Sequence, residues 1–163
     1  MKTVPQEVRL LGENDLSKLV EFIVKKDIDN PGVYISPYIT KEYFNELNLR
    51  NGLFNYSMLP FVLMENDQIC KLMLFEIPEI FEQSTYITAT FISGYTDLEF
   101  DNFFEKCTIN LKEDFPEYSK IKVLIKEDDN ICDILKKLNF ESECFLKNEL
   151  GIDKHCSVLS YIL

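Results

Sequence analysis

The feature of this sequence that most constrains its fold is an amphipathic segment between two short apolar runs. Apolar residues recur at helical spacing over residues 96–114, while charged residues fill the other face. That apolar face consists of Phe100, Phe103, Phe104, Cys107 and Leu111. The runs at 85–92 and 121–125 have the length and composition of strands. A strand, a helix and a strand in this order predict a right-handed crossover between two parallel strands.

The rest of the chain supplies further helical and strand patterns, punctuated by single prolines and by turn-forming residues. We expect one α/β (α+β mixed) domain over residues 1–163, with a mixed sheet of about seven strands and about four helices. The other expected elements are a strand at 7–11, a helix from Asn14 to about Lys26, a helix at 40–49 ended by Asn51-Gly52, a hairpin of 61–64 and 69–75, a helix at 130–138 and strands at 141–149 and 156–163.

Charge and composition exclude several classes of protein. The net charge is −11, from 28 acidic and 17 basic residues, and an acidic surface repels nucleic acid. No apolar run approaches the roughly 20 residues of a membrane helix, and the N-terminus lacks a secretory signal. We therefore expect a cytoplasmic protein with no nucleic-acid or membrane partner.

Metal and nucleophile chemistry also find little support. The five cysteines form no CxxC pair, and His155 is the only histidine, so we expect free thiols and no metal site. Zinc held by cysteines alone stays open. Cys107 is expected in the core, and His155 is expected to be exposed at a turn.

The last third of the chain carries the most specific pattern. A strand at 121–125 is followed by Asp128-Asp129-Asn130, a short helix, Leu138-Asn139-Phe140 and a hairpin. This arrangement resembles the closing part of the GNAT acyltransferase superfamily, including its strand, Asn-led helix and Lys-Leu-Gly-Phe turn. The stretch from Leu11 to Leu16 is similar to the entry into that family's first helix. The resemblance covers nearly the whole chain as an order of elements.

The resemblance implies transfer of an acetyl or other acyl group from a CoA thioester to an amine on a small molecule or a protein. It places the pantetheine of the acyl-CoA along strand 85–92, where that strand splays from 121–125. The pyrophosphate would then meet the start of helix 96–114, because a helix N-terminus attracts anions. A homodimer is left open. The implied cofactor-binding residues are Phe91, Ile92, Ser93, Gly94, Tyr95, Thr96 and Asn130.

Two departures from the family pattern count against this chemistry. Only Gly94 remains of the glycine-rich cofactor loop, and Thr96-x-x-Glu99 predicts a capping box followed by acidic residues, where phosphates would dock. The family's proton-donating tyrosine aligns with Leu135, or with Lys137 in a shifted frame. No catalytic residue is therefore assigned. The alternative is an inactive GNAT-like domain that needs no cofactor and binds a ligand or a protein.

The segment 34–46 is the expected substrate side of the site. Tyr34, Tyr38 and Tyr43 cluster there in the sequence, among acidic residues that would attract an amine. Aromatic packing beneath a loop, with solvated acids around it, explains the same residues equally simply.

Overall fold

The computed structural model describes residues 6–26, 32–78 and 84–163. Within these ranges, eight strands form one sheet in the order β1-β3-β4-β5-β6-β8-β7, and β2 pairs with β5 beside this path. The β5–β6 pair is parallel and the other pairs are antiparallel, as expected for a mixed sheet with one crossover. The strands are β1 Gln6–Leu10, β2 Val33–Ile35, β3 Met58–Glu65, β4 Gln68–Glu76, β5 Tyr86–Ser93, β6 Lys120–Lys126, β7 Glu141–Leu146 and β8 Cys156–Ile162.

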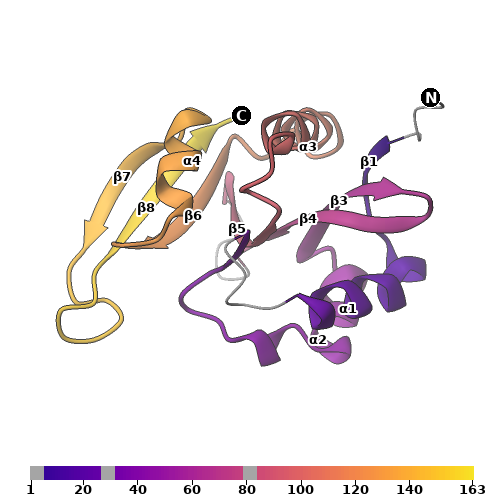
Figure 1. Ribbon diagram of the computed structural model, residues 1–163, viewed down its shortest axis with the longest axis horizontal. Coiled ribbons are helices and arrows are strands. Elements are labelled where there is room, and N and C mark those ends of the chain that lie inside the picture. The colour runs from indigo at the N-terminus through magenta and orange to yellow at the C-terminus, as the bar shows by residue number, and fades with distance from the viewer. Residues whose placement is uncertain (1–5, 27–31, 79–83) are drawn as a thin grey trace.

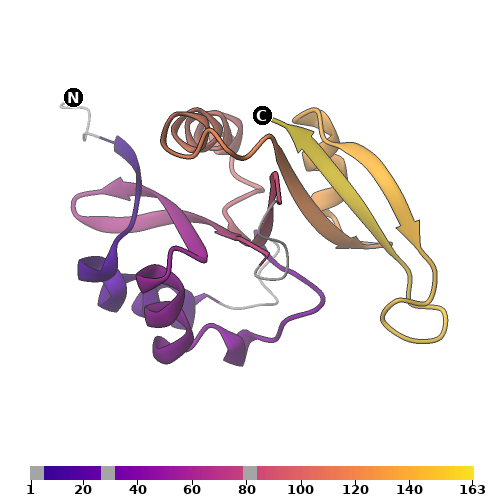
Figure 2. The same ribbon diagram turned by 180° about the vertical axis from the view of Figure 1, so that it is seen from behind.

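Helices cover both faces of the sheet. Alternation along β4 sends Leu72 and Leu74 to the layer of α1 and α2, and Met73 and Phe75 to the layer of α3 and α4. Burial on both faces explains why four successive residues of this strand, 72–75, are all apolar. The β7–β8 hairpin lies at the end of the molecule away from α1 and α2 (Figures 1 and 2). The helices are α1 Leu16–Lys25, α2 Glu46–Phe54, α3 Phe100–Asp114 and α4 Ile131–Lys137, with 3-10 turns at Glu13–Asp15 and Lys41–Tyr43.

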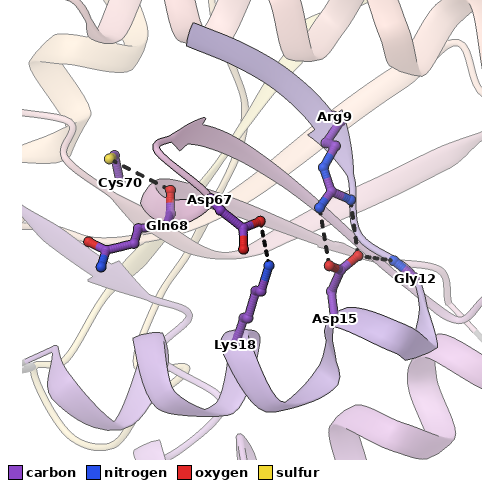
Figure 3. A network of polar contacts seen from close by, with 7 residues as sticks. All are labelled: Arg9, Gly12, Asp15, Lys18, Asp67, Gln68 and Cys70. Carbon is purple, nitrogen blue, oxygen red and sulfur yellow. Dashed lines mark hydrogen bonds and ion pairs between the residues drawn. The ribbon is translucent and has the colours of Figure 1, made fainter. Parts of the chain in front are cut away.

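The first helix begins later than the sequence pattern suggested. Asn14 lies within the 3-10 turn, so it does not cap α1 as expected. Arg9 of β1 instead donates two hydrogen bonds, of 3.0 and 3.1 Å, to the carboxylate of Asp15 (Figure 3). Lys18 forms an ion pair of 2.6 Å with Asp67 in the β3–β4 turn. These contacts attach the start of α1 to the sheet.

The second helix was wrongly bounded at 40–49. Asn45 caps α2 by accepting a hydrogen bond of 3.0 Å from the backbone N–H of Asn48. Gly52 lies inside the helix, which continues to Phe54. The Met58 side chain packs where a Cβ of residue 52 would stand, so this position requires a glycine. Tertiary packing therefore keeps a glycine inside this helix.

The crossover unit is confirmed, with a shifted helix start. α3 begins at Phe100, four residues after the expected position, and its apolar face packs into the core. Asn139 has a φ of 68°, which confirms the left-handed position expected at the end of α4.

Candidate functional site

The candidate site is the wedge between β5 and β6. These strands pair only at Tyr86–Lys120, Ile87–Ile121 and Thr88–Lys122, after which β5 continues to Ser93 without β6 beside it. β4 stays paired with the opposite edge of β5 as far as Ile92. The outer edge of β5 therefore faces the wedge over its last residues, and this edge leads to the start of α3.

The chain's own strand β2 lies along this edge. Val33, Tyr34 and Ile35 pair antiparallel with Ser93, Ile92 and Phe91. Two flanking backbone bonds extend the pairing: Ser36 N–H donates to the Thr90 carbonyl at 2.9 Å, and Gly94 N–H donates to the Gly32 carbonyl at 2.7 Å. This strand was not among the elements expected from the sequence. Its signal was the short β-branched and aromatic run between Gly32 and Pro37.

Tyr34 spans the wedge from β2 to β6. Its side chain is only 2% exposed, and its hydroxyl donates a hydrogen bond of 2.5 Å to the Leu124 carbonyl. Burial raises the pKa of this hydroxyl well above its ordinary value. Tyr34 is thus a core residue in the described conformation, and protein atoms occupy the place between the diverging strands.

The loop from Ser93 to Glu99 is also closed by internal contacts. The buried Ser93 Oγ accepts a hydrogen bond of 2.8 Å from the Leu72 N–H, and Tyr95 is 5% exposed. Gly94 has a φ of 73°, and a Cβ there would stand 2.9 Å from Asp97 Oδ2. Asp97 forms an ion pair with Lys71, whose side chain is 10% exposed. A protein carboxylate and its lysine therefore lie beside Gly94.

The capping box expected at Thr96 and Glu99 is wrong. Glu99 is the N-cap residue itself and makes no side-chain capping bond, and Thr96 is exposed in the preceding turn. Backbone bonds form this turn instead, from Asp97 N–H to the Gly94 carbonyl and from Phe100 N–H to the Asp97 carbonyl, each 3.1 Å. These bonds delay the helix to Phe100.

The three tyrosines proposed for the substrate side reach three different elements. Tyr34 contacts β6, as described above. Tyr38 is 56% exposed and shares a hydrogen bond with Glu149 of the β7–β8 loop; desolvation and this carboxylate raise the pKa of Tyr38 to about 12. The Tyr43 hydroxyl donates to Glu76 Oε1, at the end of β4, at 2.5 Å. Their hydroxyls are held by separate partners and do not meet at one point.

Asn130 lies directly before α4, whereas Phe91, Ile92 and Ser93 lie at the end of β5. It lines a surface cavity of about 520 Å³ at the carboxyl end of β6, together with residues of the segment between β6 and α4 and of the β7–β8 loop. His155 also lines it, half-buried, with Nδ1 accepting a hydrogen bond of 3.0 Å from the Asn148 N–H. Among the described residues, no group of three or more His, Cys, Asp or Glu side chains is placed to hold a metal ion.

The position expected for a proton donor is apolar and inaccessible. Leu135, a residue of α4, is fully buried and belongs to the same core cluster as the apolar face of α3. Cys107 is fully buried as expected, and its burial raises the thiol pKa, which disfavours a nucleophilic role. Each helix within the described ranges is too short or too polar to cross a bilayer.

Solved structures of acetyltransferases match this arrangement over nearly its whole length. The ribosomal-protein-S5-alanine acetyltransferase from Vibrio fischeri matches with a TM-score of 0.67 and 13% identity, covering 99% of this chain and 95% of its own. An acetyltransferase of the GNAT family from Streptococcus pneumoniae matches with a TM-score of 0.67 and 12% identity, covering 98% and 99%. This chain has the GNAT fold. A chimera of the Vibrio cholerae spermidine N-acetyltransferase matches it with a TM-score of 0.66 and 14% identity, covering 96% and 95%.

The resemblance drawn from the sequence is thus confirmed for the fold. No protein-family model matches the sequence, and no curated protein sequence matches it. In the described conformation, the GNAT wedge does not fit an acyl-CoA. β2 is bonded to the β5 edge, Tyr34 crosses to β6, and Asp97 lies beside Gly94.

Proposed function

We propose that this GNAT-fold chain is an N-acyltransferase that moves an acetyl or other acyl group from a CoA thioester to an amine. The observation that carries the proposal is the divergence of β5 and β6 beside the start of α3. That divergence leaves the outer edge of β5 without β6, at the position where the fold's acetyltransferases are expected to hold their donor, and β2 covers this edge in the described conformation. The described conformation is then the form closed to the donor.

The proposed donor residues are the β5 edge and the loop after it, together with Asn130. The side chains of Phe91, Ile92 and Ser93 are buried, so the donor would meet backbone here. Ile92 would contribute its N–H and C=O, because the alternation set by the bonds at Thr90 and Gly94 turns them to the wedge, and Phe91 and Ser93 would flank it. The donor would then lie along Gly94, Tyr95 and Thr96, in the loop that leads to α3. We assign no catalytic residue, since Leu135 replaces the expected proton donor.

The acceptor is proposed to be an amine on a small molecule or a protein. Of the three tyrosines proposed for the substrate side, Tyr38 and Tyr43 each donate a hydrogen bond to a carboxylate, of Glu149 and Glu76, whereas Tyr34 is buried in the core. A cationic amine suits these carboxylates and the net charge of −11. The structural neighbours include a ribosomal-protein acetyltransferase and a spermidine acetyltransferase, which is consistent with either kind of acceptor. The homodimer and the cytoplasmic location stay predictions.

A second candidate is a GNAT-like binding domain without turnover. Two observations favour it: β2 lies where a donor would bind, and the Lys71–Asp97 pair lies where phosphates would dock. In this case the acidic surface would recognise a basic partner, and no acyl-CoA would bind.

Thermal unfolding with acetyl-CoA from ten micromolar to a millimolar separates the two candidates. Ligand at about 100 times its dissociation constant stabilises the folded state by about 2.7 kcal/mol, which corresponds to several degrees in this size range. A saturable shift supports the acyltransferase and leads to a screen of amines for release of the free CoA thiol. No shift at a millimolar, for the wild type or for the loosened variant described below, contradicts it and favours the binding domain.

A further inference from the structure

We infer that β2 can leave the outer edge of β5 and competes with the acyl-CoA for this edge. The hydrogen bond from Tyr34 to Leu124 stabilises the closed form, in which β2 is paired with β5. This inference rests on the proposed function. Acyl-CoA then binds only to the fraction of molecules in which β2 has left the wedge. The geometry of β2 supplies three arguments for it.

The first argument is that both ligands would need the same backbone groups. In an antiparallel pair, alternate residues point both their N–H and C=O groups toward the partner strand. The bonds at Thr90 and Gly94 fix this alternation, and the register places the Tyr34–Ile92 pair between them. An extended ligand on this edge has no free donor or acceptor until β2 is displaced.

The second argument is that β2 is short and that Tyr34 is its most deeply buried residue, while Val33 and Ile35 pack against the edge of the core on the α1–α2 side. It contains three residues, and Val33 and Ile35 are only half-buried, whereas Tyr34 is 2% exposed. Tyr34 also makes the contact that crosses to β6. Loss of this side chain's hydrogen bond therefore weakens the closed form selectively.

The third argument is that nothing covalent fixes β2 in the wedge. All five cysteines are free, and β2 is held by backbone bonds to β5, by the Tyr34 contact to β6 and by the packing of Val33 and Ile35 against the α1–α2 side of the core. An extended ligand that pairs with the same edge of β5 can replace such a short strand. The apparent affinity for the donor then equals its intrinsic affinity multiplied by the open fraction.

The first test compares Tyr34→Phe with the wild type by titration calorimetry, using acetyl-CoA and the non-thiol analogue desulfo-CoA. A hydrogen bond contributes about 0.5–1.5 kcal/mol, so its removal should tighten binding by about two- to twelvefold. Tyr118→Phe is the matched control, because it removes the hydroxyl of another buried tyrosine, next to the start of β6 and away from Leu124. Its affinity should equal that of the wild type.

The second test locks β2 in place with Val33→Cys combined with Ser93→Cys. These residues face each other as a non-hydrogen-bonded pair, whose Cα atoms stand about 4.5 Å apart, within the range of a disulfide. The oxidised protein should not bind desulfo-CoA, and reduction of the same sample by dithiothreitol should restore binding. The comparison is made within this variant, because the Ser93 hydroxyl that it replaces accepts the Leu72 N–H. Wild-type protein taken through the same oxidation controls for the native cysteines.

The outcomes distinguish the inference from the function beneath it. Equal binding by the locked, reduced and wild-type proteins would overturn the inference while the donor site stands. If Tyr34→Phe binds acetyl-CoA and desulfo-CoA with the affinity of the wild type, the Tyr34 hydroxyl does not stabilise the closed form, and that part of the inference is overturned. If no variant binds at a millimolar, the acyltransferase proposal fails, and the competing role of β2 fails with it.

Discussion

Replacement of Gly94 by alanine should destabilise the fold, because the backbone there is left-handed and crowded. Gly94 has a φ of 73° and lies between β5 and the turn that leads to α3. An added Cβ would stand 2.9 Å from Asp97 Oδ2 and 3.3 Å from Cγ and Cδ of Lys71. The substitution therefore tests whether the closed loop has the conformation described above.

The expected magnitude follows from three contributions. A left-handed conformation costs an L-residue about 1–2 kcal/mol relative to glycine. Displacement of the half-exposed Asp97 from Lys71 adds at most about 1 kcal/mol. The lower entropy of the unfolded chain offsets about 0.4–1 kcal/mol of this loss. Gly94→Ala should therefore lower the free energy of unfolding by about 1–2 kcal/mol.

Gly12→Ala provides a matched control within the same chain. Gly12 has an extended backbone, with φ −110° and ψ −174°, and a Cβ there would meet no atom within 4 Å. This variant should be neutral or more stable by up to about 1 kcal/mol. Urea unfolding followed by circular dichroism measures both variants, and the melting temperature of Gly94→Ala should fall by about 2–8 °C.

One result would refute this reasoning about the loop. If Gly94→Ala is as stable as Gly12→Ala, residue 94 does not adopt the left-handed conformation, or the loop rearranges at no cost. Gly94→Asn refines the test, since asparagine tolerates the left-handed region and should lose less stability than alanine.

Two further changes test the fold around the site. Asp15→Asn should lower the free energy of unfolding by about 1 kcal/mol at pH 7. The hydrogen bonds from Arg9 lower the pKa of Asp15 in the folded protein. The stabilisation by this carboxylate is therefore present above about pH 4 and is lost as the pH falls through the lowered pKa. Urea unfolding between pH 7 and 3 should show the variant and the wild type converging at the acid end, and a constant difference would contradict this. Leu135→Ala should cost about 2–5 kcal/mol in the same assay because the residue is fully buried, whereas Leu98→Ala, at a fully exposed position, should change stability by less than about 0.5 kcal/mol; equal effects would contradict the placement of α4.

Periodicity in the sequence identified most of the secondary structure. The crossover helix, the β3–β4 hairpin and the left-handed Asn139 followed from apolar spacing and turn chemistry, because burial on one face imposes that spacing. Helix starts were less predictable. Asn14 and Thr96 are good capping residues in isolation, yet both helices begin later. Asp15, at the start of α1, is hydrogen-bonded to Arg9 of β1. Before α3, backbone bonds to the carbonyls of Gly94 and Asp97 form a turn instead of the first helical turn.

The sequence by itself determined that this chain forms a mixed sheet with a parallel crossover, that Gly94 is the single glycine of the stretch 93–99, and that position 135 holds a leucine. Only the tertiary structure decided what fills the wedge. Tyr34 is one of three tyrosines in an ordinary loop sequence, and the pairing of Val33–Ile35 with β5 depends on a strand nearly sixty residues away. A three-residue run carries too little local preference to predict a strand. Its stability comes from the open edge of β5 and the distant Leu124 carbonyl, and no local pattern contains that information.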